Sequence, residues 1–198
     1  AGGAGLEVAE VHGAHGYLLH EFLSPVTNRR EDDYGGDFEG RSRLIREVTA
    51  AVREVWPDGK PVFVRISATD CLEGRESWTV EDSACLADRL HEAGADLIDV
   101  SSGGIVPDSR PDYTGPNYQL RWAEHVREES ESDIAVGTVG GITTGEQAEA
   151  VVANDRADLA IVGREHLRDP YFTLHAARDL DATDELEGPP QYYRAFGF

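Results

Sequence analysis

Short apolar runs alternate with helical patterns along the whole chain. Five runs predict strands, and they lie at residues 6–12, 62–66, 97–100, 134–138 and 159–162. Helical patterns come between them, for example the apolar residues at helical spacing from Leu44 to Val55, which stop before Pro57. Strict alternation of strand and helix predicts a parallel sheet covered by helices.

Polar residues mark the beginnings of several predicted helices. Thr79 is expected to cap the helix after the second strand. Thr144 and Gln147 have the spacing of a capping box, in which two side chains bond to free amides of the first turn. Asp169 and Pro170 predict an N-cap and a first-turn proline for the last helix, which is expected to end near residue 178.

Two architectures fit this order of elements, an open doubly wound sheet and a closed barrel. A dinucleotide-binding sheet would carry Gly-x-Gly-x-x-Gly after its first strand, and residues 12–17 do not have this pattern. A closed barrel requires eight units, typically in about 250 residues. We therefore expect an α/β fold of the TIM (β/α)8 type with only about five units over residues 1–180, followed by a tail at 181–198.

The charge balance narrows the choice of partners. Acidic residues number 38 against 18 basic ones, for a formal net charge of −20, and Lys60 is the only lysine. Such a surface repels phosphates, so neither nucleic acid nor a membrane is expected as a partner. The regular apolar segments argue against disorder. Because salt would screen this self-repulsion, we interpret the composition as that of a halophilic protein.

Cysteines and leader signals add little to this interpretation. Cys71 and Cys85 form neither a metal-ligand spacing nor a disulfide framework. The apolar runs are too short to cross a bilayer, and no leader pattern opens the sequence. We expect a cytoplasmic protein without a metal site.

Candidate catalytic residues cluster after the first strand, where parallel α/β folds place their chemistry. His12 and His15 are separated by two residues in the expected turn, and Tyr17 follows. Two such histidines can direct two N–H donors at one acceptor, and Tyr17 adds a phenolic proton. A metal-binding pair and two exposed loop histidines are the alternatives, although the sequence reveals no third metal ligand.

Arg65 stands among apolar residues in the second strand. A charge there costs free energy unless it is paired or faces a ligand. Arg65 is expected either to point into a site inside the barrel or to form an internal ion pair, for which Asp99 on the next strand is the candidate.

The last two strands end in turns that suit a phosphate. Val139, Gly140 and Gly141 end the fourth of the five strands, and Gly163 and Arg164 follow the fifth. Late glycine turns of a barrel commonly bind phosphate through exposed backbone N–H groups, and an arginine adds a charged fork.

These blocks together resemble the signature of the old yellow enzyme family of FMN-dependent ene-reductases. The run from His12 to Pro25 carries the resemblance with six further blocks, Asn28-Arg29-Arg30, Asp33-Tyr34-Gly35-Gly36, Glu39-Gly40-Arg41, Phe63-Val64-Arg65-Ile66-Ser67-Ala68, Ser101-Ser102-Gly103 and residues 163–170. The resemblance spans nearly the whole chain. It implies strands 4–8 of an FMN-containing barrel that reduces enones, enals and nitroalkenes with NADPH or NADH.

The resemblance also implies roles for the residues named above. His12 and His15 would hydrogen-bond the carbonyl or nitro oxygen of the substrate. Hydride would come from the flavin, and Tyr17 would protonate the α-carbon. Arg65 would lie at the N1/O2 edge of the flavin, where a cation stabilises negative charge.

The remaining implied contacts involve the phosphate and a second subunit. The amides of residues 139–141, with Gly163 and Arg164, would hold the FMN phosphate. The tail is similar to that of the shorter bacterial dimers, so Arg194 would reach the substrate in a neighbouring subunit of a dimer or tetramer. Two features depart from the family pattern: the first three strands of the barrel are absent, and Gly40 stands where asparagine is commoner.

Two other functions are compatible with the sequence. A phosphate-binding barrel aldolase or synthase also uses late glycine turns, but Lys60 precedes its strand and would lie on the face opposite a Schiff base. A non-catalytic half-barrel is the second alternative. It would bind flavin poorly, or only after assembly with another chain, because five strands leave open edges.

Overall fold

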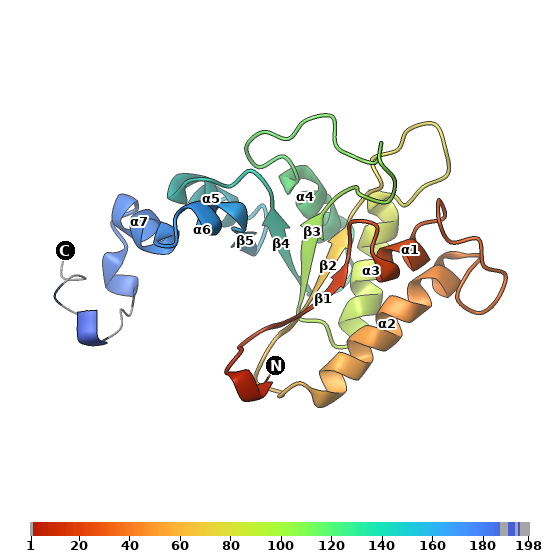
Figure 1. Ribbon diagram of the computed structural model, residues 1–198, viewed down its shortest axis with the longest axis horizontal. Helices are drawn as coiled ribbons and strands as arrows, with labels where there is room; N and C mark the ends of the chain where they lie inside the picture. The colour runs from red at the N-terminus through yellow and green to blue at the C-terminus, as the bar shows by residue number, and fades with distance from the viewer. Residues whose placement is uncertain (1, 187–189, 193, 195–198) are drawn as a thin grey trace.

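The computed structural model describes residues 2–186, 190–192 and 194. One parallel sheet runs through the centre in the order β1-β2-β3-β4-β5, with strands at Ala9–Gly13, Val62–Ser67, Leu97–Ser101, Ala135–Val139 and Leu159–Ile161. Each strand pairs with the next one in the chain (Figure 1). A doubly wound sheet would reverse its strand order, whereas a barrel wall does not. The predicted α/β fold with a partial barrel is therefore confirmed.

Seven α-helices accompany the sheet in the described part of the chain. They are α1 Leu18–Leu23, α2 Phe38–Val55, α3 Val80–Glu92, α4 Leu120–Glu129, α5 Gly145–Val152, α6 Arg164–Arg168 and α7 Phe172–Asp179. Short 3-10 turns lie at Gly2–Ala4, Thr183–Glu185 and Pro190–Tyr192. Helices α2, α3 and α4 cover one face of the sheet, and the 3-10 turn Thr183–Glu185 after α7 lies away from it (Figure 1).

The core lies between the sheet and these helices. Alternate residues of a strand point to opposite faces, so every second apolar side chain meets a helix. The side chains at the centre of this layer are fully buried, namely Val62, Val64, Ile66, Ile98, Val100, Val136, Leu86, Leu90, Ala123 and Val126. Burying one Val, Leu or Ile side chain contributes about 1.5–3 kcal/mol relative to leaving it exposed.

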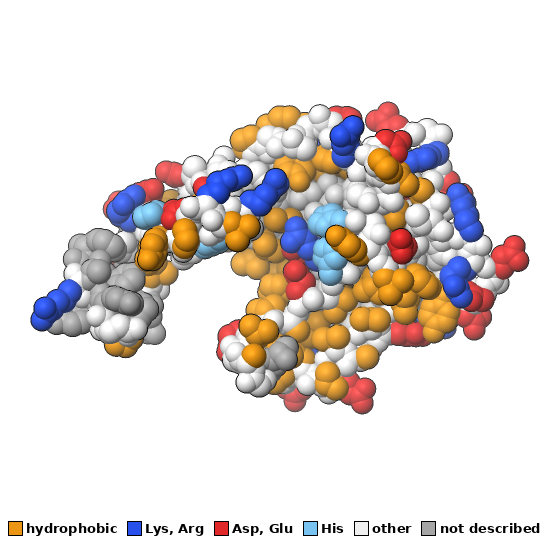
Figure 2. Space-filling view, viewed as in Figure 1, with side chains coloured by type: hydrophobic (Ala, Val, Ile, Leu, Met, Phe, Trp, Pro, Cys, Tyr) orange, Lys and Arg blue, Asp and Glu red, His pale blue; other side chains and the backbone are white. Residues whose placement is uncertain are grey.

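The opposite face of the sheet is the inner wall of the barrel segment. In the described residues β1 and β5 do not pair with each other, so the wall remains open. Figure 2 shows a hollow beside this wall, bordered by histidine and arginine side chains. The side chains that carry the expected chemistry therefore gather on the face that the helices leave uncovered.

The ends of the first elements differ from the expectation. β1 begins at Ala9 and not at the expected residue 6, and a short helix, α1, lies between β1 and α2. α2 begins at Phe38, because the Asp37 carboxylate accepts the Gly40 N–H at 3.0 Å and caps the helix. A Cβ at Gly40 would overlap the carbonyl oxygen of Gly35. Close packing thus explains the glycine at this position.

The predicted caps agree with the structure in two of three places. Thr79 forms a reciprocal capping box at the start of α3. Thr144 accepts the Gln147 N–H at 3.3 Å and caps α5, but the predicted capping box is incomplete, because Gln147 Oε1 accepts the Thr143 N–H at 2.7 Å and not that of Thr144. The prediction for Asp169 is wrong, because α7 begins at Phe172 and α6 occupies the residues just before Asp169. The Asp169 carboxylate still accepts a backbone N–H at 3.0 Å, but that of Tyr171 in the connecting turn.

Candidate active site

The register of the sheet aligns three predicted or suspected residues in one row. His12 of β1 is paired with Arg65 of β2, and Arg65 with Asp99 of β3. Because paired residues share a face, all three lie on the inner wall. Parallel pairing therefore places an imidazole, a guanidinium and a carboxyl group next to one another.

Arg65 pairs with Asp99 and also faces the open wall. Its Nη1 lies 3.3 Å from Asp99 Oδ2, and Asp99 is fully buried. Burial raises the pKa of Asp99 to about 7, with the Arg65 guanidinium opposing the rise and the nearby Glu10 adding to it. Arg65 also lines a cavity on this wall. Arg65 thus forms the internal ion pair and at the same time faces a cavity.

The three residues predicted to be catalytic lie close together at the carboxyl end of β1 and in the turn after it. The ring centroids of His12 and His15 are 5.3 Å apart, and those of His12 and Tyr17 are 5.5 Å apart. Burial lowers the pKa of His15 to about 4, and the positive charge of Arg65 adds to this effect. Burial also lowers the pKa of His12. Both imidazoles are therefore neutral at pH 7, and each carries one N–H donor.

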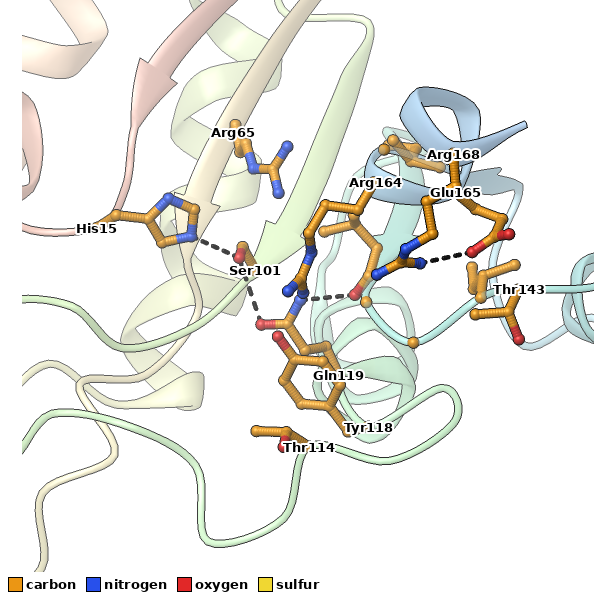
Figure 3. A pocket seen from close by; sticks show the side chains of 16 residues that line it. His15, Arg65, Ser101, Thr114, Tyr118, Gln119, Thr143, Arg164, Glu165 and Arg168 are labelled. Carbon is orange, nitrogen blue, oxygen red and sulfur yellow. Dashed lines mark hydrogen bonds and ion pairs between the residues drawn. The ribbon is translucent and has the colours of Figure 1, made fainter. Parts of the chain in front are cut away.

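A chain of hydrogen bonds determines which nitrogen of His15 carries that proton. Gln119 Nε2 donates to the Val139 carbonyl at 2.6 Å, so its Oε1 faces Ser101 and Ser102. Both hydroxyls donate to this oxygen, at 3.3 Å and 2.6 Å. Ser101 Oγ must then accept from His15 Nε2, 2.7 Å away (Figure 3). A substrate oxygen would therefore compete with Ser101 for the His15 N–H.

A cavity of about 470 Å³ connects His15 and Arg65 with the turns after β4 and β5. Thr114, Tyr118 and Gln119 form its side wall, as Figure 3 shows. His12 and Tyr17 do not line it. The cavity thus extends from the histidine turn to the predicted phosphate turns, a span that suits an elongated, planar ligand with a phosphate at one end.

Glycines allow the turn after β4 to lie against the cavity. Gly140 and Gly141 have φ of +116° and +71°, a region that other residues rarely adopt. A Cβ at Gly140 would come within 2.6 Å of the Tyr118 ring, and one at Gly141 would overlap the carbonyl oxygen of Gly115. Gly163 has open space around it. These turns therefore present bare backbone to the cavity.

Charge at this end of the cavity suits an anion. Arg164 and Arg168 line it, and Arg168 forms an ion pair with Glu165 at 2.6 Å. In the described part of the chain the Arg164 side chain forms neither an ion pair nor a hydrogen bond. A buried Arg65 Nε likewise has no hydrogen-bond partner there. The glycine turns and the Arg164 guanidinium fit the phosphate of an FMN. Arg65, with its unused Nε–H, fits the edge of the flavin ring.

Two predicted residues lie elsewhere. Arg194 is exposed in a turn after the 3-10 helix Pro190–Tyr192 and does not line the cavity, while Tyr193 and residues 195–198 lie outside the described residues. Lys60 precedes β2, and its Nζ donates to the Leu6 carbonyl at 2.7 Å. It therefore lies at the other end of the strands, away from the cavity.

Two other kinds of feature are absent from the described residues. Among them, no group of three or more His, Cys, Asp or Glu side chains is arranged to hold a metal ion. None of the helices in this part of the chain combines the length and the apolar character that a membrane span requires.

Comparison with known proteins decides the family. The family model for NADH:flavin oxidoreductase / NADH oxidase matches residues 1–183. The chain belongs to this family. The NADPH dehydrogenase of Listeria monocytogenes is 49% identical over 193 residues, which are 98% of this chain and 54% of that protein. The NADPH dehydrogenase of Bacillus cytotoxicus is 50% identical over 194 residues, with 98% and 53% covered. The chain thus spans about half the length of these curated relatives.

Solved structures share the fold. 2-Naphthoyl-CoA reductase superposes with a TM-score of 0.78 at 26% identity, over 92% of this chain and 28% of that one. Morphinone reductase in complex with tetrahydroNAD gives 0.66 at 27% identity, over 91% and 45%. The sheet described above is therefore the same kind of barrel wall as in these enzymes.

Sequence reasoning missed part of the cavity wall. Gln119 is buried just before α4, where a polar residue gives no periodic signal, and its contact with Val139 depends on tertiary structure. Ser101 belonged to a recognised block but had no predicted role. Its position at the end of a strand was the signal that could have identified it, since such positions face the site.

Proposed function

We propose that the protein is an FMN-dependent oxidoreductase that uses NADPH or NADH to reduce the C=C bonds of enones, enals or nitroalkenes. The observation that carries this proposal is one cavity that joins two bare glycine turns and Arg164 to the histidine turn. Support comes from the family, from relatives named NADPH dehydrogenase, and from a morphinone reductase solved with a nicotinamide analogue.

The phosphate end of FMN would be held by the turns after β4 and β5. The amides of residues 139–141 and of Gly163 would donate to phosphate oxygens, and the Arg164 guanidinium would add charge. Arg65 would lie at the N1/O2 edge of the flavin ring, held there by Asp99. When bound, FMN supplies the hydride that it has received from the nicotinamide.

His12 and His15 would bind the carbonyl or nitro oxygen of the substrate. A neutral imidazole donates a hydrogen bond without giving up a proton, so it polarises the double bond and leaves the oxygen unprotonated. The low pKa of His15 keeps this ring neutral over the whole physiological range. The His15 N–H must first leave Ser101, which links substrate binding to the Gln119 hydrogen bonds.

Tyr17 would protonate the α-carbon. Its phenol is 66% exposed and lies next to His12. After hydride reaches the β-carbon, the Tyr17 O–H gives its proton to the carbon beside the polarised group, which completes the reduction of the double bond. Solvent can return a proton to the exposed phenolate.

The proposal also covers organisation beyond one chain. Residues 1–180 would form the catalytic barrel segment, and the tail at 181–198 would lie at the interface of a dimer or tetramer, where Arg194 reaches the substrate in the neighbouring subunit. Sedimentation of the protein measures this assembly, and a monomer with full activity would contradict the role of Arg194.

The deciding experiment follows the flavin absorbance of the purified protein in molar salt after FMN is added. We expect a bound-flavin spectrum that bleaches with NADPH and recovers with cyclohexenone. Bleaching without recovery by any enone, enal or nitroalkene would contradict the proposed substrates while leaving the flavin reductase in place. Absence of bound flavin would favour the half-barrel that requires a second chain.

A further inference from the structure

Two titratable side chains are fully buried beneath the histidine turn, and the reaction proposed above uses neither. His20 of α1 and Asp70, three residues beyond the end of β2, both have no exposed surface. His20 Nε2 lies 3.0 Å from Asp70 Oδ1. Burial of such groups is unfavourable unless hydrogen bonds satisfy them, so their remaining contacts show what they do.

The protonation of His20 follows from its other nitrogen. The backbone N–H of Gly16 points at His20 Nδ1 over 2.9 Å. A backbone amide can only donate, so Nδ1 is an acceptor and carries no proton. The single proton of the ring is therefore on Nε2, from which it is donated to Asp70. His20 is neutral in this arrangement and has one defined tautomer.

Asp70 holds that tautomer in place. Its Oδ2 accepts the Ser24 hydroxyl at 2.6 Å and the Trp78 N–H at 2.8 Å. The carboxylate therefore accepts three hydrogen bonds. They come from His20 of α1, from Ser24 just after α1 and from Trp78 in the loop before α3. The Asp70 carbonyl also accepts the Ser109 hydroxyl at 2.6 Å. Asp70 thus joins three loops at the carboxyl ends of the strands.

The turn above this pair carries His15 and Tyr17 in an unusual backbone conformation. His15 and Gly16 have φ of +60° and +75°, two consecutive residues in the left-handed region. Each amide of the turn has its own acceptor. His15 N–H binds Ser67 Oγ at 3.0 Å, Gly16 N–H binds His20, and Tyr17 N–H binds the Ala14 carbonyl at 3.3 Å. Only the middle acceptor is a titratable side chain.

We infer that His20 and Asp70 are positioning residues, in which Asp70 fixes the tautomer of His20 so that His20 Nδ1 holds the Gly16 amide and with it the relative placement of His15 and Tyr17. The inference rests on the proposed function, because the placement matters only if these two side chains act on one substrate. Neither residue contacts the substrate.

Two substitutions of His20 separate its two hydrogen bonds. His20→Asn keeps an oxygen where Nδ1 lies and can still accept the Gly16 N–H. His20→Gln places its amide near Nε2 and can reach Asp70, but it leaves Gly16 without an acceptor. In the FMN-loaded protein we expect kcat for cyclohexenone reduction to fall about tenfold or more in His20→Gln, and to stay within about threefold of wild type in His20→Asn. Equal losses in the two variants would overturn the inference.

A matched control removes a neighbouring hydrogen bond without touching the turn. Ser24→Ala deletes one donor to Asp70 and leaves the His20–Gly16 bond. We expect a lower melting temperature for this variant with kcat close to wild type. If Ser24→Ala lowers kcat as much as His20→Gln does at the same loss of melting temperature, the effect is general destabilisation and the inference fails.

Two measurements do not depend on turnover. Two-bond ¹H–¹⁵N NMR spectra of the wild-type protein report the His20 tautomer, and hydrogen exchange reports the protection of the Gly16 amide. We expect Nε2–H and strong protection, with protection lost in His20→Gln but not in His20→Asn. An Nδ1–H tautomer would overturn the inference directly. Wild type without enone reduction, but with this exchange pattern, would contradict the proposed function and leave the hydrogen-bond assignment standing.

Discussion

The turn after β1 and the turn after β4 lie at opposite ends of the cavity and are stabilised in different ways. In the first, side chains and a carbonyl accept every amide from residue 15 to residue 17. In the second, Gly140 and Gly141 leave the backbone bare and closely packed against Tyr118 and Gly115. The difference indicates that the backbone amides of the first turn already have acceptors, so this turn serves to orient side chains. The backbone amides of the second turn remain available to an incoming anion.

The largest effect is expected from a side chain at the second turn. In Gly141→Ala, the new Cβ would overlap the Gly115 carbonyl at a φ of +71° that alanine adopts at a cost. We expect FMN affinity to fall about a hundredfold or more, as the turn moves away from the phosphate. Fluorescence titration with FMN measures this. Gly59→Ala is the control, since a Cβ there meets nothing within 4 Å. Similar losses in both variants would contradict the proposed role of the turn after β4 in holding the FMN phosphate.

A smaller effect is expected from the first turn. Tyr17→Phe removes the proposed proton donor and keeps the ring. We expect the rate of reoxidation by cyclohexenone to fall about ten- to a hundredfold. FMN affinity should be unchanged, because Tyr17 does not line the cavity that would hold FMN. Stopped-flow absorbance checks this, with Tyr113→Phe, at another exposed tyrosine, as the control. Loss of FMN binding in Tyr17→Phe would break the comparison between the turns.

Asp99 and His15, which lie between the two turns, are expected to make stability depend on pH. The pKa of Asp99 is raised to about 7 in the folded state, above its ordinary value, so folding favours the protonated carboxyl. Its contribution to stability is therefore present at low pH and is lost as the pH rises from about 4 through about 7. His15 has the opposite sign, since its pKa is lowered to about 4 and folding disfavours its charging as the pH falls below about 6.5.

Asp99→Asn isolates the first of these contributions. We expect the stability of the variant relative to wild type to increase between pH 5 and 8, because the amide does not ionise. Urea unfolding at several pH values measures the difference. A difference that stays constant over this range would mean that Asp99 is already ionised and stabilised by Arg65 throughout.

The smallest effect concerns the whole surface. With a net charge of −20, molar KCl is expected to raise the melting temperature by several degrees through screening of self-repulsion. Scanning calorimetry in low and molar salt checks this, and no rise would contradict the halophilic interpretation. Screening acts everywhere, so hydrogen exchange should slow at both turns. A change confined to one of them would point to a specific ion site.

Much of the fold could be predicted because it is encoded locally. Apolar periodicity and polar caps located all five strands and the starts of α3 and α5. Local signals failed where another element decided the boundary. Residues 18–23 span fewer than two helical turns, too few for a period to stand out, yet they form α1, whose Leu19 and Leu23 are buried. Asp169 has the chemistry of an N-cap, but α6 comes directly before it, and the carboxylate caps the turn between α6 and α7 instead.

The candidate site divides in the same way. His12, His15, Tyr17, Arg65 and the glycine turns could be selected from the sequence alone, because each follows or interrupts a strand with a residue type that the local pattern does not require. Only the tertiary structure decided that Asp99 pairs with Arg65 while Arg65 still faces the cavity, that Gln119 reaches Val139, and that His20 meets Asp70. These contacts join residues from 20 to 50 positions apart. Sheet register and loop packing set them, and neither leaves a periodic trace in the chain.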